Sequence, residues 1–219
     1  MRTRRRKLLG GALLLLPALV GCQLFATIGI LTAPRRIQKA QFHLTKDRLA
    51  ILIEAARPGE ENPVFNRTLH EKLVEIFALE KVNTNVVPYE EMLRLRQRNP
   101  DYARWSLQRI GRGVGAEQVL EVRLDRLRLE ATASNPVVEP YAQAYLKVIG
   151  VHELDDAAWL WPPRTERRGY AVEASRPARE TSSLGEVDAE AGRFAREFAY
   201  VVAAPFYDVD LEEKPPREP

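Results

Sequence analysis

The sequence predicts a single mixed α/β (α+β) domain, in which helices pack on a mixed sheet whose second half is an antiparallel meander. An apolar run at 48–54 has the length of a strand, and from Pro63 apolar residues recur at helical spacing. Apolar and polar residues then alternate over 141–154, the period of a half-buried strand. A second amphipathic helical pattern at 186–203 closes the domain, which follows an N-terminal signal or anchor helix.

The first half of the domain reads as strand, helix, strand, helix, helix. The nearly continuous apolarity of 48–54 indicates a strand covered on both faces. Residues 84–87 predict a second short strand, and Pro88 is well placed to open a helix. Asp101 is expected to cap a third helix that ends in the glycine-rich stretch 111–115.

The second half reads as strands and a closing helix. Residues 118–131 form a predicted strand whose alternation slips at Asp125-Arg126, as a bulge would cause. Further strands are expected at 159–161 and 169–174. In 141–154 one face carries Ala142, Ala144, Leu146 and Val148, and the other carries Tyr141, Gln143, Tyr145 and Lys147. The closing helix is expected to bury Val187, Ala191, Phe194, Phe198 and Val201.

The first 21 residues have the layout of a secretory signal peptide. Residues 2–7 carry five positive charges, 8–20 form a 13-residue apolar core, and Gly21 follows. That core is shorter than the ~20 residues needed to span a bilayer. The sequence therefore predicts export, with a membrane-proximal linker at 22–47, the domain at 48–207 and a disordered tail at 208–219.

The end of this leader, Leu19-Val20-Gly21-Cys22, resembles the bacterial lipoprotein box. The resemblance implies that Cys22 receives a diacylglyceryl group on sulfur, that the chain is cut before it, and that its new amino terminus is acylated. Several acyl chains, such as palmitate, hold a protein far more firmly than one myristoyl group. Gln23 after the cysteine resembles the sorting of lipoproteins to the outer membrane, which would place the domain in the periplasm.

A rival interpretation of the leader is an uncleaved signal anchor. Apolar residues continue past Cys22, so 8–33 also reads as one 26-residue span interrupted by Gln23. Arg35 and Arg36 argue mildly against it, because basic residues prefer the cytoplasmic flank and here both flanks are basic. Either interpretation tethers the domain to a membrane.

Charge and cysteine content restrict the function of the mature chain. The whole chain has a net charge of +3, but without the five basic residues of the leader it holds 28 basic and 30 acidic residues, a net of −2. Basic residues are scattered along the sequence, which gives little support to nucleic acid as a partner. With one cysteine, no intramolecular disulfide can form.

Part of the domain resembles a known group of envelope domains. Residues 110–120 contain Gly115-Ala116-Glu117 between a predicted helix and the strand that starts the meander. Over 48–154 this pattern is similar to the curli secretion-channel lipoprotein and to the amino-terminal domain of the Tol-Pal translocation protein, where Asp usually stands in place of Glu117. The resemblance implies a fold and an envelope-assembly or binding role, not a reaction.

One motif formally matches a dinucleotide fingerprint. Gly111, Gly113 and Ala116 fit Gly-x-Gly-x-x-Ala, and Glu130 lies where a ribose-binding acid is expected. The fingerprint must follow a strand and open a helix, whereas here it follows a helix and opens a strand. We therefore interpret it as a helix stop and expect no cofactor.

No other residues form a recognisable catalytic or metal site. The histidines have no paired metal-ligand spacing, and no serine lies in a Gly-x-Ser-x-Gly elbow. The acidic pairs fall in predicted loops or the tail, where solvated charge is expected. Aromatic residues at 159, 161 and 170 form either a binding patch or core anchors. The residues concerned are His43, His70 and His152, Glu60-Glu61, Asp155-Asp156 and Glu212-Glu213, and Trp159, Trp161 and Tyr170.

The sequence favours a non-catalytic, lipid-anchored envelope protein that binds a protein partner or a second copy of itself. The alternative is an envelope enzyme or small-ligand carrier whose site is assembled from residues far apart in sequence. A pocket with converging acidic or histidine side chains would favour the alternative, and an exposed aromatic patch or flat apolar strand edge would favour the first. The one site residue predicted is Cys22, as the lipid acceptor.

Overall fold

The computed structural model describes residues 36–57, 61–129, 137–153, 155–177, 179–180 and 184–212. The chain divides into two compact units. The smaller comprises 1–37 and 210–214, and in it the amide of Leu211 donates to the carbonyl of Arg36 at 2.9 Å. The larger comprises 38–209 and 215–219 and contains the sheet and the helices. The predicted signal peptide and Cys22 lie outside the described residues.

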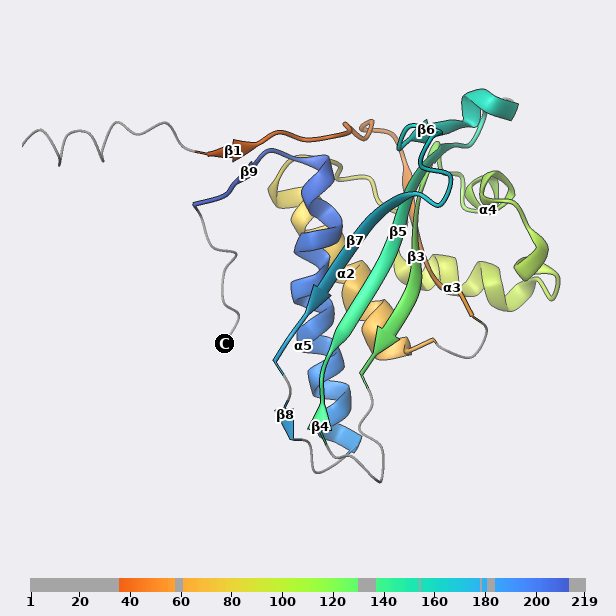
Figure 1. Cartoon of the computed structure of the whole chain (residues 1–219). Coiled ribbons are helices and arrows are strands. Elements are labelled where there is room, and N and C mark those ends of the chain that lie inside the picture. The colour runs from red at the N-terminus through yellow and green to blue at the C-terminus, as the bar shows by residue number, and fades with distance from the viewer. Residues whose placement is uncertain are drawn as a thin grey trace, which may run out of the picture. The chain divides into compact units, whose positions relative to one another are not determined.

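The larger unit is built on a five-stranded mixed sheet (Figure 1). Strand β2 pairs parallel with β3, and β3 pairs antiparallel with β5. On its other edge β5 pairs with β6 at one end and with β7 along the rest of its length. The strands are β2 (Leu49–Ala55), β3 (Gln118–Arg128), β5 (Tyr141–Gly150), β6 (Trp159–Trp161) and β7 (Tyr170–Ser175).

Helices and short strand pairs complete the described structure. The α-helices are α2 (Pro63–Leu79), α3 (Tyr89–Arg98), α4 (Leu107–Gly113) and α5 (Leu184–Ala203), and the 3-10 helices are η1 (Tyr102–Arg104), η2 (Asp155–Ala158) and η3 (Ala204–Phe206). Two-stranded sheets join β1 (Ile37–Gln38) with β9 (Val209–Asp210), and β4 (Val137–Val138) with β8 (Arg179–Glu180).

Helices α2 and α5 cover one face of the sheet and enclose the main core (Figure 1). Phe65 from α2 lies about equally far from Phe194 and Phe198 of α5, with ring centroids 6.1 Å apart in both cases. All three rings are fully buried. Burying an aromatic side chain removes a large apolar area from water, so this contact is a main source of the domain's stability.

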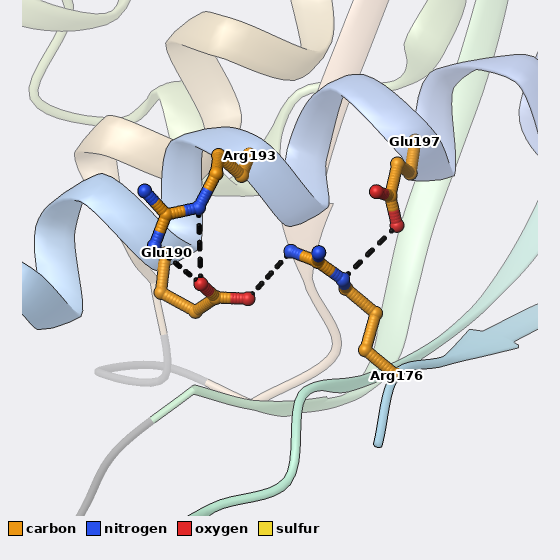
Figure 2. Close-up of polar contacts among 4 residues, drawn as sticks. All are labelled: Arg176, Glu190, Arg193 and Glu197. Atoms are coloured by element: carbon orange, nitrogen blue, oxygen red, sulfur yellow. Dashed lines mark hydrogen bonds and ion pairs between the residues drawn. The ribbon is translucent and has the colours of Figure 1, made fainter. Parts of the chain in front are cut away.

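An ion-pair cluster around the buried carboxylate of Glu190 fixes α5 to the end of β7 (Figure 2). The carboxylate of Glu190, only 3% exposed, accepts hydrogen bonds from Arg176 at 2.6 Å and from Arg193 at 2.6 and 3.1 Å. Arg176 also pairs with Glu197 at 3.3 Å. Each charge in the cluster has a partner of opposite sign, which a buried carboxylate requires.

The opposite face of the sheet is covered by shorter helices. Helix α3 packs on β2, and α4 packs on the start of β3 and the end of β5. Between these helices and the sheet lies a second core, which includes Leu52, Met92 and Ile110. Strand β2 has buried side chains on both faces, as its apolarity predicts.

The structure confirms the predicted fold class and most of its elements. The strands at 48–54, 159–161 and 169–174, the helix from Pro63, and the buried set Ala142, Ala144, Leu146 and Val148 are all observed. The closing helix buries Ala191, Phe194 and Phe198 as predicted, but Val187 and Val201 are half-exposed, and Val202 is buried instead.

Three predicted elements were wrong in detail. The strand at 84–87 is a single parallel bridge between Val86 and Leu49, because Pro88 ends the pairing at the start of α3. The helix expected from Asp101 divides into η1 and α4, because Trp105 between them is extended, and Ser106 rather than Asp101 caps α4. The loop expected at Asp155-Asp156 is the 3-10 helix η2.

The ends of the domain also carry structure. Leu44, inside the predicted linker, is buried in the main core. Asp208, the first residue of the predicted tail, accepts hydrogen bonds from the Lys39 ammonium at 2.6 Å and from the Ala40 amide at 3.0 Å, and β9 follows it. Residues 213–219 lie outside the described part of the chain.

A bulge in β3 sets which side chains face the core. Opposite β5, Leu124 pairs with Ala144 and Arg126 with Gln143, so Asp125 is the extra residue. Because side chains alternate with period two, this insertion moves Leu127 to the core side and Arg126 to the opposite side. The slip at Asp125-Arg126 predicted from the sequence is confirmed.

Deleting Asp125 should therefore leave the domain folded with a regular β3. Leu124 would then be followed directly by Arg126, so Leu127 stays on the core side and Arg126 and Arg128 stay on the opposite side. Circular dichroism during thermal unfolding should show a cooperative transition for this deletion. The control deletion of Arg123, in the regular part of β3, should abolish the transition, because it turns Leu124 away from the core and Asp125 toward it, and an unpaired buried charge costs about 3–5 kcal/mol. An Asp125 deletion that unfolds like the Arg123 deletion would contradict the assigned register.

Candidate functional site

Helices α3 and α4 cover only part of their side of the sheet. The rest of that side is a polar surface rich in cations and aromatic rings, which we call the open face. Its side chains come from β3, β5 and β6, at register positions on the side opposite α2 and α5. They range from half-buried to exposed. The open face comprises Arg123, Arg126, Arg128, Tyr141, Tyr145, Lys147 and Trp159.

Three cation–aromatic pairs lie along the open face. The guanidinium of Arg128 lies 5.0 Å from the centre of the Tyr141 ring, and that of Arg123 lies 5.7 Å from the centre of Tyr145. The ammonium of Lys147 lies 4.8 Å from the centre of Trp159. In each pair the two residues come from neighbouring strands, so the sheet register places them together. Such pairs are worth about 0.5–1 kcal/mol at exposed sites.

Hydrogen bonds hold these side chains in place. Arg123 donates to the carbonyl of Arg168 at 3.1 Å, which ties β3 to the loop before β7. The hydroxyl of Tyr141 donates to the carboxylate of Glu173 on β7 at 3.1 Å. Partial desolvation and this hydrogen bond to Glu173 raise the pKa of Tyr141, so its hydroxyl stays protonated at neutral pH.

Lys147 is a largely buried cation of the open face. Its side chain is 13% exposed, and its ammonium lies 3.5 Å from the carboxylate of Glu121, whose side chain is 11% exposed. Because the two residues face each other across β3 and β5, the pair is set by the register. The Glu121 charge offsets that of Lys147, and Glu173 of β7 adds a second carboxylate to this side of the sheet, so the net positive charge of the face comes from its three arginines.

The open face corrects the expectation that basic residues are scattered. They are scattered in the sequence, but the bulge and the pairing of β3 with β5 gather Arg123, Arg126, Arg128 and Lys147 on one surface. The signal was partly present, because Tyr141, Tyr145 and Lys147 already shared a predicted face. What the sequence did not show is that α3 and α4 leave this face uncovered.

A pocket of about 690 Å³ lies at the end of the open face next to α4. Leu107, Ile149 and Ala158 form an apolar part of its wall, and the Trp159 ring forms another. The indole N–H of Trp159 donates to the carbonyl of Pro162, which fixes the orientation of the ring. Lys147, Arg164 and Arg167 bring positive charge to the pocket.

A smaller pocket of about 140 Å³ lies beside β2, between α2 and α3. Burial, and next the charge of Glu121, raise the pKa of Glu54 in this pocket, while Arg96 opposes the rise. Glu61 is paired with Arg96 at 2.8 and 3.1 Å. Of the acidic pairs, Glu61 is thus held in an ion pair, while Glu60 and Glu213 lie outside the described residues.

The glycine-rich motif closes a helix, as predicted. The amide of Gly115 donates to the carbonyl of Arg112 and the amide of Ala116 to that of Gly111, the two hydrogen bonds of a Schellman motif. Gly115 has φ +62°, the left-handed conformation that such a stop requires. At Gly111 an added Cβ would lie 2.5 Å from a methyl of Val151, so this glycine serves packing. Glu130 lies outside the described residues.

The histidines lie apart in the fold. His43 and His152 are exposed, and His152 lies 3.3 Å from Glu117. His70 is 2% exposed, and its ring centroid lies 5.5 Å from that of Tyr89. In the described part of the chain, no group of three or more histidine, cysteine, aspartate or glutamate residues is placed to hold a metal ion.

The aromatic residues of the meander have different roles. Trp161 is buried against Tyr170 and Phe206, with ring centroids 5.1 and 5.3 Å apart, so it anchors the core. Trp159, two residues earlier, points to the other side of the sheet and belongs to the open face. The core-anchor alternative is therefore confirmed for Trp161, while Trp159 lies outside the main core on the open face.

His70 should make folding stability depend on pH. Burial lowers its pKa from 6.5 to about 4, and a hydrogen bond to the backbone of Val87 only partly opposes this. The unfolded chain then binds more protons than the folded one between pH 6.5 and 4, so stability falls as the pH drops through this window. At pH 5 the expected loss is about 2 kcal/mol relative to pH 7. Urea unfolding at both pH values measures it.

Two variants separate His70 from the other groups. In His70→Leu the part of the pH dependence due to His70 should disappear, whatever the absolute stability of the variant. In His43→Gln, which changes an exposed histidine, the dependence should match the wild type. An unchanged slope in His70→Leu would show that His70 titrates normally in the folded state.

The chain is thus a mixed α/β domain, and one side of its sheet carries cationic and aromatic side chains. Among the residues that the structure describes, no helix is long and apolar enough to cross a membrane. No protein-family model and no curated protein sequence matches the chain.

Three solved structures of bacterial proteins are distantly similar to this chain. A PelC dodecamer from Paraburkholderia phytofirmans is 12% identical, covering 78% of this chain and 96% of that one, with a TM-score of 0.35. Lipoprotein GNA1162 from Neisseria meningitidis is 13% identical, covering 70% and 98%, with a TM-score of 0.36. The LpoB C-terminal domain from Salmonella enterica is 15% identical, covering 63% and 87%, with a TM-score of 0.35. These similarities assign no family or activity to the chain.

Proposed function

We propose that this chain is a non-catalytic bacterial envelope lipoprotein whose domain binds another envelope component through the open face. The observation that carries the binding role is the row of three cation–aromatic pairs on a sheet surface that the helices of the described residues leave partly exposed. Aromatic rings and arginines are enriched in protein interfaces, because they combine a large contact area with hydrogen-bonding groups. A half-exposed row of them matches the exposed aromatic patch expected of a binding protein.

The tether rests on the leader. In this proposal residues 1–21 are a signal peptide, Cys22 carries the lipid, and the residues after Cys22 link it to the domain, with Leu44 and Asp208 already part of the domain. The protein would then be held at the periplasmic side of the outer membrane, where Gln23 directs it. Retention of residues 8–33 as an uncleaved anchor is the alternative.

Mass spectrometry of the membrane fraction tests the tether. The wild-type chain should begin at Cys22 and carry a diacylglyceryl group on sulfur and an acyl group on the amino terminus. The Cys22→Ser variant should lack the lipid and should not be processed at this site. Recovery of a wild-type chain that keeps residues 1–21 and bears no lipid would replace the lipoprotein by a signal-anchored protein.

The charge of the open face indicates the chemistry of its partner. Glu121 offsets Lys147, whereas Arg126 and Arg128 add positive charge at exposed positions. Complementary charge steers association and selects partners, and exposed ionic contacts weaken as salt increases. We therefore infer an acidic surface on the partner, which is either a different protein or a second copy of this chain.

Photo-crosslinking in cells tests the face directly. A photoreactive phenylalanine analogue replacing Tyr145 should give a discrete crosslinked species. The same group replacing Glu71, exposed on α2 on the other side of the sheet, should not. Adding Arg126→Glu and Arg128→Glu should abolish the crosslinked species formed from position 145, because the two new carboxylates would repel the acidic surface of the partner. A species of twice the monomer mass would identify a second copy as the partner.

Two results would contradict this proposal, the first its binding role and the second its acidic partner. Crosslinking of equal strength from positions 145 and 71 would mean that the face is not selective. A Tyr145 species that survives both arginine reversals would mean that charge does not hold the partner.

The alternative function is that of an envelope enzyme or small-ligand carrier, which would need converging acidic or histidine side chains in a pocket. The pocket beside β2 comes nearest to this arrangement, because Glu54 there has a raised pKa. Its second carboxylate, Glu61, is already held by Arg96 in two hydrogen bonds. That pairing supports a structural role for Glu61 rather than the free acid–base pair that hydrolytic chemistry uses.

A further inference from the structure

The pocket of about 140 Å³ beside β2 has walls that are fixed by ion pairs. Arg96 of α3 pairs with Glu61, just before α2, at 2.8 Å, and Arg67 of α2 pairs with Glu90 of α3 at 2.8 Å. These contacts hold the two flanking helices together. The pocket is smaller than the roughly 300–1,000 Å³ of sites for drug-sized molecules, so it suits a ligand of a few heavy atoms.

The edge of β2 brings backbone groups to this pocket. On the side away from β3, the amide and carbonyl of Leu49 pair with the backbone of Asn85 and Val87. Because the backbone groups of a strand alternate in direction, those of Ile51 and Ile53 point to the same edge, and both residues line the pocket. Neither has a backbone partner on this edge among the described residues. The edge offers N–H and C=O groups alike, so the side chains select the charge of a ligand.

A buried side chain from α2 supplies an acceptor without a partner. Asn66 lines the pocket and is only 5% exposed, and its amide oxygen has no hydrogen-bond partner among the described residues. Most buried polar atoms in proteins are hydrogen-bonded, and leaving one unpaired is costly. A ligand that donates a hydrogen bond to Asn66 therefore gains binding energy.

The side chains that line the pocket leave one carboxylate without a counter-ion. Arg96 is held by Glu61 in two hydrogen bonds, whereas Glu54 is in no ion pair with a described residue. Arg57 is exposed and does not line the pocket. Residues 58–60, which connect β2 to α2 and lie outside the described residues, include no basic residue. The pocket therefore favours a cation.

We propose that this pocket binds a primary alkylammonium group, which donates hydrogen bonds to Glu54, to the amide oxygen of Asn66 and to a carbonyl of β2. An ammonium has three donors and no acceptor, which matches these three oxygens. Met92 and Leu93 of α3 form an apolar wall for the alkyl chain, and the rings of Tyr89 and Tyr102 add surfaces that attract a cation. An inorganic cation would leave the apolar wall unused.

Saturation-transfer NMR of the full-length protein in detergent tests this site. The probes are butylammonium, 1-butanol, which has the same chain without the charge, and tetramethylammonium, which has the charge without N–H donors. Butylammonium should bind at least about tenfold more tightly than either of the others, because only it combines charge, donors and chain. Comparable binding of 1-butanol or tetramethylammonium, or displacement of butylammonium by equimolar potassium ions, would overturn the proposal.

Variants locate the binding. Glu54→Gln and, separately, Asn66→Leu should each weaken butylammonium binding by roughly tenfold or more. Glu71→Gln, which changes an exposed carboxylate on α2, should leave it unchanged. Circular dichroism checks that each variant is folded, and Glu54→Gln, which keeps the shape of the side chain, carries the test if Asn66→Leu unfolds. Absence of binding to the wild type, or binding that Glu54→Gln does not weaken, would overturn the proposal.

A lysine derivative distinguishes two sources of the alkylammonium group. Nα-acetyl-lysine methylamide carries the same four-carbon amine on a peptide unit. Affinity equal to that of butylammonium would assign the site to a lysine side chain of another protein, and affinity at least about tenfold lower would assign it to a free amine. Either result is independent of the proposed function, because no residue that lines this pocket belongs to the open face.

Discussion

The alternation of side chains along β3 and β5 is the constraint on which the rest of the structure depends. Side chains of a strand point to opposite faces in turn, so beyond the part that α3 and α4 cover, each of these long strands has the main core on one side and water on the other. In β5 this holds without interruption, with Ala142 to Val148 buried at every second position. In β3 the bulge at Asp125 restores it, placing Leu127 toward the core and Arg126 toward the open face. The main core and the open face are therefore two consequences of one register.

The open face exists because its cover is shorter than the sheet. Ten residues of β5 extend about 33 Å, whereas the seven residues of α4 span about 10 Å. On the other side, the 17 and 20 residues of α2 and α5 are long enough to follow the strands. The uncovered part of the sheet can remain in water only if its side chains are polar or have polar ends. Paired arginines, lysines and tyrosines meet that condition, and where α4 ends next to them a pocket forms.

Most of the fold followed from local patterns in the sequence. Helical spacing, strand alternation and even the bulge depend on neighbouring residues, and all three predicted the observed structure at α2, β5 and Asp125. The errors arose where a tertiary contact or a single residue decided the outcome, as at Trp105, which divides the helix expected from Asp101. The open face escaped prediction because its arginines are scattered in the sequence and come together only through strand pairing. The pocket was not foreseen either, since its lining comes from α4, β5, η2, β6 and the loop to β7.

Hydroxyl-radical footprinting in intact cell envelopes is the most direct test of the central claim that the open face is a binding surface. Tyr145 and Trp159 lie on this face, whereas the half-buried Tyr200 of α5 lies on the other side of the sheet and serves as an internal control. The account predicts that Tyr145 and Trp159 are modified several times more slowly in the envelope than in the purified protein, with Tyr200 unchanged. Equal rates for all three residues in both samples would contradict it.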